Sequence, residues 1–280
     1  MARHTTISVL GCGWLGLPLA EALSAAGFEV RGSVRTAEKK LLLAQKGIRP
    51  YQLLLNRENV ELDDPSFFDT DIIITAIPPG RSSDLLSVFP DRIRQLSFYL
   101  EKKHVPKILF ISSTSVYPEL SGVVREDNRE LPDKASGRTL LQAEKILSGN
   151  DAYRTTILRF GGLIGADRDP ARFLSRQKGI QEGNKPVNLI HRDDCIAMIT
   201  ELIRQDVWGE VFNACCPVHP TRKEFYEKAS SVSGMPAPEF NEDGPPDWKT
   251  VDSSKLINRL NYRFIYPDPM DWLEELEKKS

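Results

Sequence analysis

Three glycines near the start of the chain have a spacing that suits phosphate binding. Gly11, Gly13 and Gly16 follow the pattern G-x-G-x-x-G, directly after the mostly apolar residues 7–10. Glycine allows a tight turn at the first position, leaves room for a pyrophosphate at the second, and lets helix and strand approach closely at the third. Free N–H groups at the start of the next helix attract phosphates. The residues expected to hold a dinucleotide here are Gly11, Gly13, Trp14, Leu15 and Gly16.

The segments around this motif alternate between strand and helix, which is the context it requires. Strands are predicted at 7–10, 28–34, 51–55, 71–77 and 107–113, with helices at 14–26, 36–46 and 82–100. Such alternation implies parallel strands joined by right-handed helical crossovers. We therefore expect an α/β fold with a doubly wound parallel sheet, an NAD(P)-binding Rossmann fold, whose ligands bind at the carboxyl ends of the strands.

The end of the second strand indicates which dinucleotide is bound. NAD-binding proteins usually carry an acidic residue about 20 residues beyond the glycines, where it holds the ribose 2′-hydroxyl. The segment from Val30 to Arg35 contains no acid, and Arg35 is placed to face a 2′-phosphate. We predict NADP as the cofactor, with NAD as the alternative. From the ends of the next strands, Ile77, Pro78 and Ser112 are expected to line the same site.

Composition excludes several other classes of function. A net charge of −2 over 280 residues provides no argument for nucleic acid or a membrane surface as a partner. Four cysteines form no disulfide framework in a chain this long, and no C-x-x-C or histidine cluster indicates a metal site. The apolar N-terminal stretch imitates a signal peptide, but its removal would delete the first strand. We expect a cytoplasmic protein without a metal, as a monomer or homodimer.

The second half adds a family resemblance. Residues 111–118, ISSTSVYP, resemble the serine-rich segment of extended short-chain dehydrogenases, the epimerase/dehydratase group that acts on nucleotide sugars. Four later segments are similar to that family in the same order, namely 158–165, 188–199, 211–230 and 251–268. The glycine pattern departs from the usual T-G-x-x-G-x-x-G, which points to an atypical branch close to the YeeZ-like proteins. The resemblance implies a small-molecule substrate, with nucleotide-linked compounds among the candidates.

The domain boundaries follow from the same comparison. Residues 1–160 are expected to form the dinucleotide-binding domain, 187–215 to return to it, and 161–280 to form a smaller substrate-binding cap. Within the cap, the basic stretch 166–179 either faces a diphosphate or is a solvated helix with Phe173 and Leu174 buried. The sequence also predicts a capping box at Thr221-x-x-Glu224 and an amphipathic helix over 268–279.

The residues expected at the catalytic positions differ from those of the family. Its members use a Tyr-x-x-x-Lys pair, in which tyrosine is the general acid or base and lysine holds the nicotinamide ribose. With Ala143-Glu144 aligned to the family's Ala-Glu, Ser136 stands in the place of tyrosine and Leu140 in that of lysine. Neither can do the chemistry, whereas Ser113 occupies the position of the family's catalytic serine.

Three interpretations of this site remain. In the first, the protein is an oxidoreductase or epimerase that takes its proton from another group, with Tyr117, His191 and Asp193 as candidates. Each also has a structural explanation, since Tyr117 can pack in a turn and Asp193 or Asp194 can cap a helix. In the second, the protein is a non-catalytic NADP(H)-responsive sensor or scaffold. In the third, a reductase only delivers hydride and solvent supplies the proton. Because the predicted dinucleotide-binding residues look intact, we favour an enzyme.

Overall fold

The computed structural model describes residues 5–80, 82–165, 167–174, 177–241 and 248–279, and the chain divides into two compact units. Unit 1 comprises Met1–Val116, Pro132–Leu158 and Thr200–Val211, and unit 2 comprises Tyr117–Leu131, Arg159–Ile199 and Phe212–Ser280. Each unit is thus assembled from three separate segments of the chain.

An eight-stranded sheet has the order β11-β8-β6-β5-β1-β2-β3-β4. Its strands are β1 (Thr6–Leu10), β2 (Glu29–Val34), β3 (Arg49–Leu55), β4 (Val60–Leu62), β5 (Ile72–Thr75), β6 (Lys107–Ser113), β8 (Arg154–Phe160) and β11 (Val211–Ala214). Strand β1 pairs in parallel with β2 on one side and β5 on the other. The winding direction therefore reverses at β1, which is where ligands of such sheets bind. The predicted α/β fold with a doubly wound, mostly parallel sheet is confirmed.

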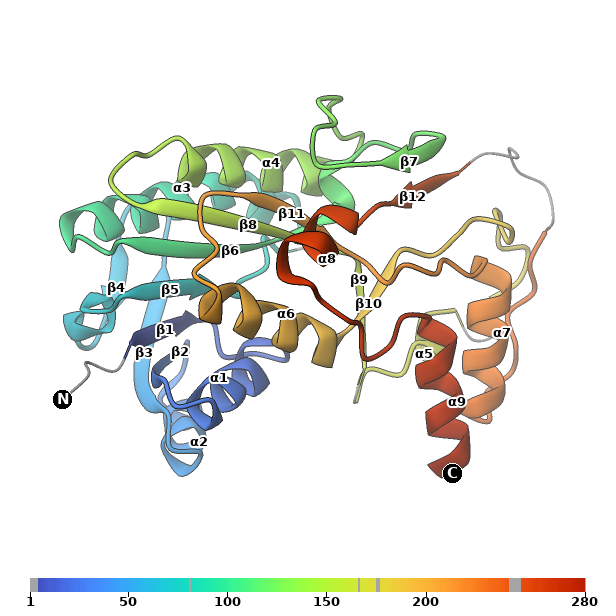
Figure 1. Cartoon of the computed structure of the whole chain (residues 1–280), viewed down its shortest axis with the longest axis horizontal. Helices are drawn as coiled ribbons and strands as arrows, with labels where there is room; N and C mark the ends of the chain where they lie inside the picture. The colour runs from blue at the N-terminus through green and yellow to red at the C-terminus, as the bar shows by residue number, and fades with distance from the viewer. Residues whose placement is uncertain (1–4, 81, 166, 175–176, 242–247, 280) are drawn as a thin grey trace. The chain divides into compact units, whose positions relative to one another are not determined.

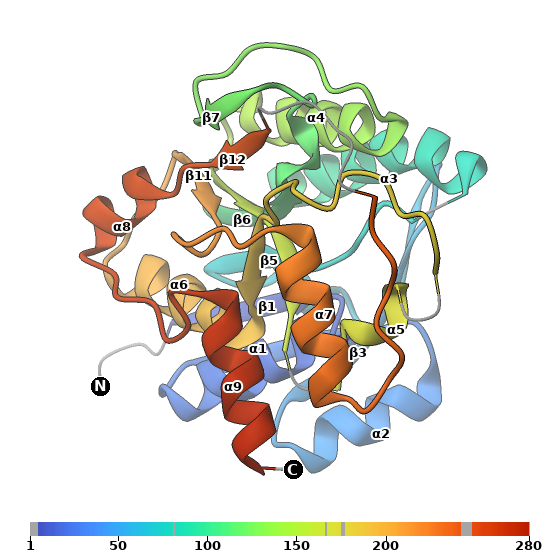
Figure 2. The same cartoon turned by 90° about the vertical axis from the view of Figure 1, so that its right-hand side faces the viewer.

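Helices cover both faces of the sheet in unit 1. The helices are α1 (Gly16–Ala25), α2 (Ala37–Gln45), α3 (Ser83–Lys102) and α4 (Ala135–Ser148), with short 3-10 turns η1 (Pro65–Phe68) and η2 (Thr114–Val116). Helices α1 and α2 lie on one face, and α3 and α4 lie side by side on the other (Figures 1 and 2). Every residue of β1 and β5 is buried, as expected for apolar, β-branched strands covered on both faces.

Some boundaries differ from those predicted. Helix α1 begins at Gly16 instead of Trp14, because the N–H of Gly13 turns back to the carbonyl of Gly11 (2.8 Å) and these residues form a loop. Pro18 lies in the first turn, where a missing N–H costs little. Strand β4 was not predicted, since three residues are too few for a periodic pattern, and it pairs antiparallel to β3.

Unit 2 consists mainly of short elements. They are β7 (Gly122–Val124), β9 (Gly162–Ile164), α5 (Ala171–Leu174), β10 (Leu189–His191), α6 (Arg192–Arg204), α7 (Arg222–Val232), β12 (Lys249–Val251), α8 (Ser254–Leu260) and α9 (Pro269–Lys279), with α6 continuing into unit 1. Strand β9 pairs with β10, and β7 pairs with β12. The capping box at the start of α7 is confirmed, because the Thr221 side chain and the Glu224 side chain each accept the other's backbone N–H.

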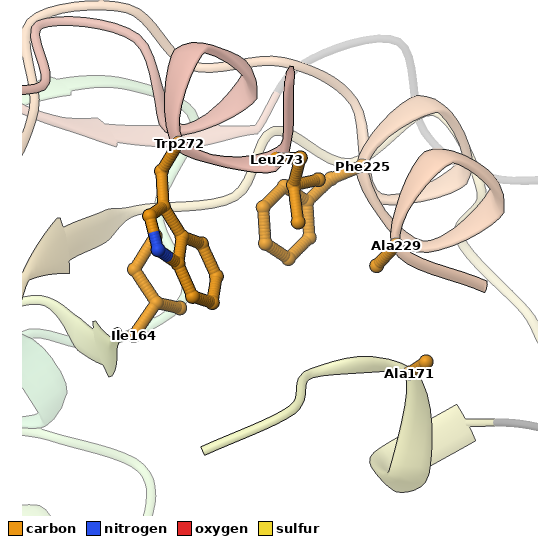
Figure 3. Close-up of a cluster of buried hydrophobic side chains, with 6 residues drawn as sticks. All are labelled: Ile164, Ala171, Phe225, Ala229, Trp272 and Leu273. Atoms are coloured by element: carbon orange, nitrogen blue, oxygen red, sulfur yellow. The ribbon is translucent and has the colours of Figure 1, made fainter. Parts of the chain in front are cut away.

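An apolar cluster holds three helices of unit 2 together (Figure 3). Its buried members come from β9, α5, α7 and α9, and are Ile164, Ala171, Phe225, Ala229, Trp272 and Leu273. The predicted amphipathic helix near the C-terminus is therefore confirmed as α9. The predicted burial of Phe173 is wrong: its side chain is 53% exposed, because α5 is a single turn and only Ala171 and Leu174, three residues apart, face inward. Arg176 of the same basic stretch lies outside the described residues.

Candidate dinucleotide site

The glycine loop lies between β1 and α1 and is held by the end of β2. Gly11 has a left-handed backbone (φ +96°), and its N–H donates to the Ser33 hydroxyl at 3.0 Å. The next N–H, of Cys12, donates to the Ser33 carbonyl at 2.8 Å. Ser33 was not among the predicted site residues, although a small polar residue near the end of a buried strand is a detectable signal.

The three glycines differ in what the protein itself requires of them. A Cβ atom on Gly11 would lie 2.7 Å from the Cγ2 of Ile77, and one on Gly16 would lie 2.2 Å from the carbonyl oxygen of Gly11. A Cβ atom on Gly13 would have no protein atom within 4 Å. Packing therefore explains the first and third glycines, whereas the open space at Gly13 fits a phosphate group brought close to the backbone.

The start of α1 is suited to an anion. Its N-cap residue, Leu15, provides no side-chain hydrogen bond, and no acidic residue lies in the first turn. The first N–H groups of a helix have no acceptor within the helix, and the helix dipole makes this end positive. Backbone groups, and no charged side chain of the loop, would hold the phosphates.

Cys12 packs against β2 within this loop. Burial raises the pKa of its thiol to about 12, so the thiol stays protonated at neutral pH. A Cβ atom on Gly32 would lie 2.7 Å from the Cys12 sulfur, so the thiol rests directly on β2. A buried thiol with a raised pKa is a poor nucleophile.

Arg35 follows the last residue of β2 and is exposed. Its backbone carbonyl accepts a hydrogen bond from the Gln52 side chain at 3.2 Å. No carboxylate in the described part of the chain forms an ion pair with its guanidinium. The geometry is compatible with a 2′-phosphate beyond the end of β2, since a free guanidinium binds phosphate through parallel N–H donors.

The ends of β5 and β6 contribute the remaining residues predicted for unit 1. Ile77 packs beside Gly11, and Pro78 is exposed just after it. The Ser112 hydroxyl is buried and donates to a carboxylate oxygen of Glu144 on α4 at 2.5 Å, so it is turned toward the helix. The Ser113 hydroxyl accepts the N–H of Ser115 at 3.2 Å.

Helix α4 packs closely on the segment after β6 and contains no Tyr-x-x-x-Lys pair. A Cβ atom on Gly137 would lie 2.0 Å from the carbonyl oxygen of Ser115, so only glycine fits there. Its neighbour Ser136 is half-buried, and Leu140 is buried at 5% exposure. Helix α4 thus lies against the segment after β6. At these two positions it carries Ser136, whose hydroxyl is a weak acid, and Leu140, which is uncharged.

In unit 2, the Tyr117 side chain is fully engaged within the protein. Its hydroxyl donates to the Asn213 side chain at 2.6 Å and accepts from Arg159 at 2.7 Å, and the Arg159 guanidinium lies over the ring at 5.1 Å. Burial raises the pKa of Tyr117, and the charge of Arg159 opposes that rise. These contacts favour the structural interpretation of Tyr117.

The start of α6 differs from the prediction that an aspartate caps it. The Nδ1 atom of His191, which precedes the helix, accepts the N–H of Asp193 at 3.2 Å, so the imidazole acts as the cap. Asp194 instead accepts hydrogen bonds from the Tyr262 hydroxyl and from the N–H groups of Ile265 and Tyr266. Buried carboxylates are normally satisfied by hydrogen-bond donors, and Asp194 takes its donors from residues outside α6.

Two further features of the described residues bear on function. Among them, no three histidine, cysteine, aspartate or glutamate side chains gather closely enough to bind a metal ion. Within the same part of the chain, every helix is too short or too polar to span a bilayer.

Comparison with known proteins agrees with this geometry. A family model described as NAD(P)H-binding matches residues 11–206. The chain is 34% identical to protein YeeZ of Escherichia coli (strain K12) over 267 residues, which cover 94% of this chain and 97% of YeeZ. YeeZ of Escherichia coli O157:H7 has the same identity and coverage.

Solved structures share the fold at lower identity. A functionally unknown conserved protein from Silicibacter pomeroyi DSS aligns over 99% of both chains, with a TM-score of 0.77 and 20% identity. The UDP-glucuronic acid 4-epimerase of Bacillus cereus, in complex with NAD, covers 98% of this chain and 100% of its own, with a TM-score of 0.76 and 22% identity. From the glycine loop, the sheet order and these matches, the chain belongs to the NAD(P)H-binding family and is a relative of protein YeeZ.

Proposed function

We propose that this protein is an NADP(H)-dependent oxidoreductase that acts on a small carbonyl or hydroxyl substrate. The observation that carries the proposal is the space at Gly13, which no packing within the protein requires, at the uncapped start of α1. An intact dinucleotide site of this kind favours a role in which the bound cofactor is used.

Each part of the cofactor has a counterpart in unit 1. The pyrophosphate would lie in the open space beside Gly13 at the start of α1, the 2′-phosphate would be held by Arg35, and Ile77 and Pro78 would lie beside the rest of the cofactor. When bound, the nicotinamide supplies or accepts a hydride. Ser112 contributes through its backbone, since its hydroxyl is held by Glu144.

Ser113 is the proposed contact to the substrate oxygen. A hydroxyl has one hydrogen to donate and can accept twice, and the Ser113 oxygen already accepts the N–H of Ser115. Its hydrogen is therefore left for a substrate oxygen. Without the tyrosine–lysine pair, solvent supplies the proton, and the loss of a general acid slows such a step by about 10²- to 10⁴-fold. An acceptor that is already activated tolerates this loss best.

The cofactor preference is tested by titration with NADPH and NADH. We expect NADPH to bind more tightly, and Arg35→Ala to weaken NADPH by about 10- to 100-fold, the range of a charge-assisted hydrogen bond, while NADH is unchanged. Arg94→Ala removes an exposed arginine from α3, on the opposite face of the sheet, and should change neither affinity. Equal binding of both cofactors by the wild type would refute the assignment of Arg35.

The reaction is tested by following oxidation of NADPH with a panel of carbonyl compounds and nucleotide sugars. Nucleotide sugars belong in the panel because a protein of the same fold is a UDP-glucuronic acid 4-epimerase. Turnover by the wild type and its loss in Ser113→Ala would support the proposal. If turnover is found but is unchanged in Ser113→Ala, the role of this serine is wrong.

A second function, a dinucleotide-responsive sensor or scaffold, is favoured by a specific observation. The family resemblance implies Ser136 and Leu140 in the positions of the catalytic pair, whereas Gly137 allows α4 to pack tightly against the serine segment. A protein that had kept the fold but abandoned the chemistry would have this combination. Tight NADPH binding with no oxidation by any compound of the panel would favour the sensor over the enzyme.

A further inference from the structure

We infer that Ser33 and Gly32, at the end of β2, position the phosphate loop and thereby set the affinity for the dinucleotide irrespective of its 2′-phosphate. This inference rests on the proposed cofactor binding and adds a determinant to it. The two residues lie in β2, and Arg35 comes just after this strand, two positions beyond Ser33, so the same strand end would serve two separate functions.

The hydrogen bonds of Ser33 account for two consecutive N–H groups of the loop. Its hydroxyl accepts the N–H of Gly11 at 3.0 Å, and its carbonyl accepts the N–H of Cys12 at 2.8 Å. Ser33 is only 2% exposed, so its hydroxyl faces the protein and not solvent. Since Gly11 has a left-handed backbone, this side-chain bond fixes the direction in which the chain leaves β1.

Gly32 provides the second attachment. A Cβ atom there would lie 2.7 Å from the sulfur of Cys12, 2.9 Å from Ile48 and 3.2 Å from Leu43. Because Gly32 has no side chain, the Cys12 thiol can pack directly against the backbone of β2. The loop is therefore attached to β2 by one side-chain hydrogen bond, one backbone hydrogen bond and one packing contact.

These attachments hold the loop in one shape before any ligand arrives. A preorganised loop loses less conformational freedom on binding, which increases affinity without a new contact to the ligand. Loosening the loop should weaken every ligand that uses it. NADPH and NADH share the pyrophosphate, so both should lose affinity by the same factor, in contrast to the selective effect of Arg35→Ala.

The test measures dissociation constants of the Ser33→Ala variant for both cofactors. We expect both to rise together by about 2- to 10-fold, the range of one hydrogen bond. The matched control is Ser8→Ala, because the Ser8 hydroxyl in β1 is also buried and donates to the Phe67 carbonyl at 2.6 Å. Both variants should lower the melting temperature, but only Ser33→Ala should change the affinities.

Three outcomes overturn the inference. One is a Ser33→Ala variant with affinities equal to those of Ser8→Ala. Another is a change confined to NADPH, which would place Ser33 at the 2′-phosphate. If Ser33→Ala does not fold, Cys12→Ala removes the packing contact instead, and unchanged affinities in that variant overturn the inference equally. A wild type that binds neither cofactor refutes the proposed function itself, which distinguishes the two failures.

Discussion

At the scale of single residues, the glycine motif contains two different physical requirements. Gly11 and Gly16 are needed by the protein, because a Cβ atom on either would collide with Ile77 or with the loop backbone. Gly13 is needed only if something else occupies the space beside it. Mutations at the two kinds of position should therefore separate stability from binding.

We predict that Gly13→Val leaves stability nearly unchanged and abolishes binding of both NADPH and NADH. The new side chain meets no protein atom, but it fills the space proposed for the pyrophosphate. Equilibrium unfolding in urea and cofactor titration of the same preparation measure the two effects. Gly16→Ala is the matched control and should lower the free energy of unfolding, since its Cβ atom would lie 2.2 Å from a carbonyl oxygen. Full cofactor affinity in Gly13→Val would contradict the proposed site.

Residue types and spacing were enough to identify the backbone of the loop but not the side chains that hold it. The spacing of Gly11, Gly13 and Gly16 fixed a strand, a turn and a helix in order. The role of Ser33 depends on β2 lying beside β1, and a pairing between strands cannot be seen in one segment. Asp194 was misassigned for the same reason, since its donors come from residues 262–266, about 70 positions away.

At the scale of elements, local signals worked best where an element satisfies its own hydrogen bonds. The capping box of α7 is contained in four residues, so the sequence shows all of it. Strand β6 has the predicted bounds because an apolar, β-branched run ends in serines. The local signal failed for α5. The amphipathic pattern predicted that both Phe173 and Leu174 are buried, but α5 is a single turn and Phe173 is exposed.

The capping box of α7 makes a quantitative prediction. Thr221→Ala removes the hydroxyl oxygen that accepts the Glu224 N–H. This N–H in the first turn of α7 then has no side-chain acceptor. We expect the free energy of unfolding to fall by about 1 kcal/mol. Urea denaturation measures the change, with Thr221→Ser as the control that retains the hydroxyl. A loss of the same size in both variants would assign the effect to the threonine methyl group and not to the cap.

At the scale of the whole molecule, the chain builds two units from interleaved segments. The parallel direction of the central strands follows from the alternation of strands and helices in the first half. The separation of residues 117–131 from the surrounding segments does not, because it depends on contacts such as that between Tyr117 and Asn213, which are 96 positions apart. That residues 161–280 bind the substrate stays a prediction.

Unit 2 also contains a buried histidine that should make stability depend on pH. The His191 ring is 3% exposed, packs against Tyr266 and Trp272, and accepts the Asp193 N–H through Nδ1, so the folded protein favours the neutral imidazole. Burial lowers the pKa of His191 below its ordinary value of 6.5, while the carboxylate of Asp193 opposes the shift.

The sign of the effect follows from proton binding. Well above pH 6.5 the imidazole is neutral in both states and contributes no pH dependence. As the pH falls below 6.5, the unfolded chain takes up a proton that the folded protein does not, so the free energy of unfolding decreases. The decrease ends once the pH falls through the lowered pKa of the folded state, and its steepest slope is about 1.4 kcal/mol per pH unit.

His191→Asn isolates this contribution, because the asparagine oxygen can still cap α6 but does not titrate. We expect the variant to lose packing stability at every pH and to have a flatter decline in the free energy of unfolding, measured in urea between about pH 5 and 8. His219→Asn is the matched control, since burial also lowers the pKa of His219 and its Nδ1 lies 3.2 Å from the Val187 carbonyl. Each variant should remove only the part of the decline in the free energy of unfolding that its own histidine contributes. A decline in His191→Asn as steep as in the wild type would mean that the folded protein takes up the His191 proton as readily as the unfolded chain does.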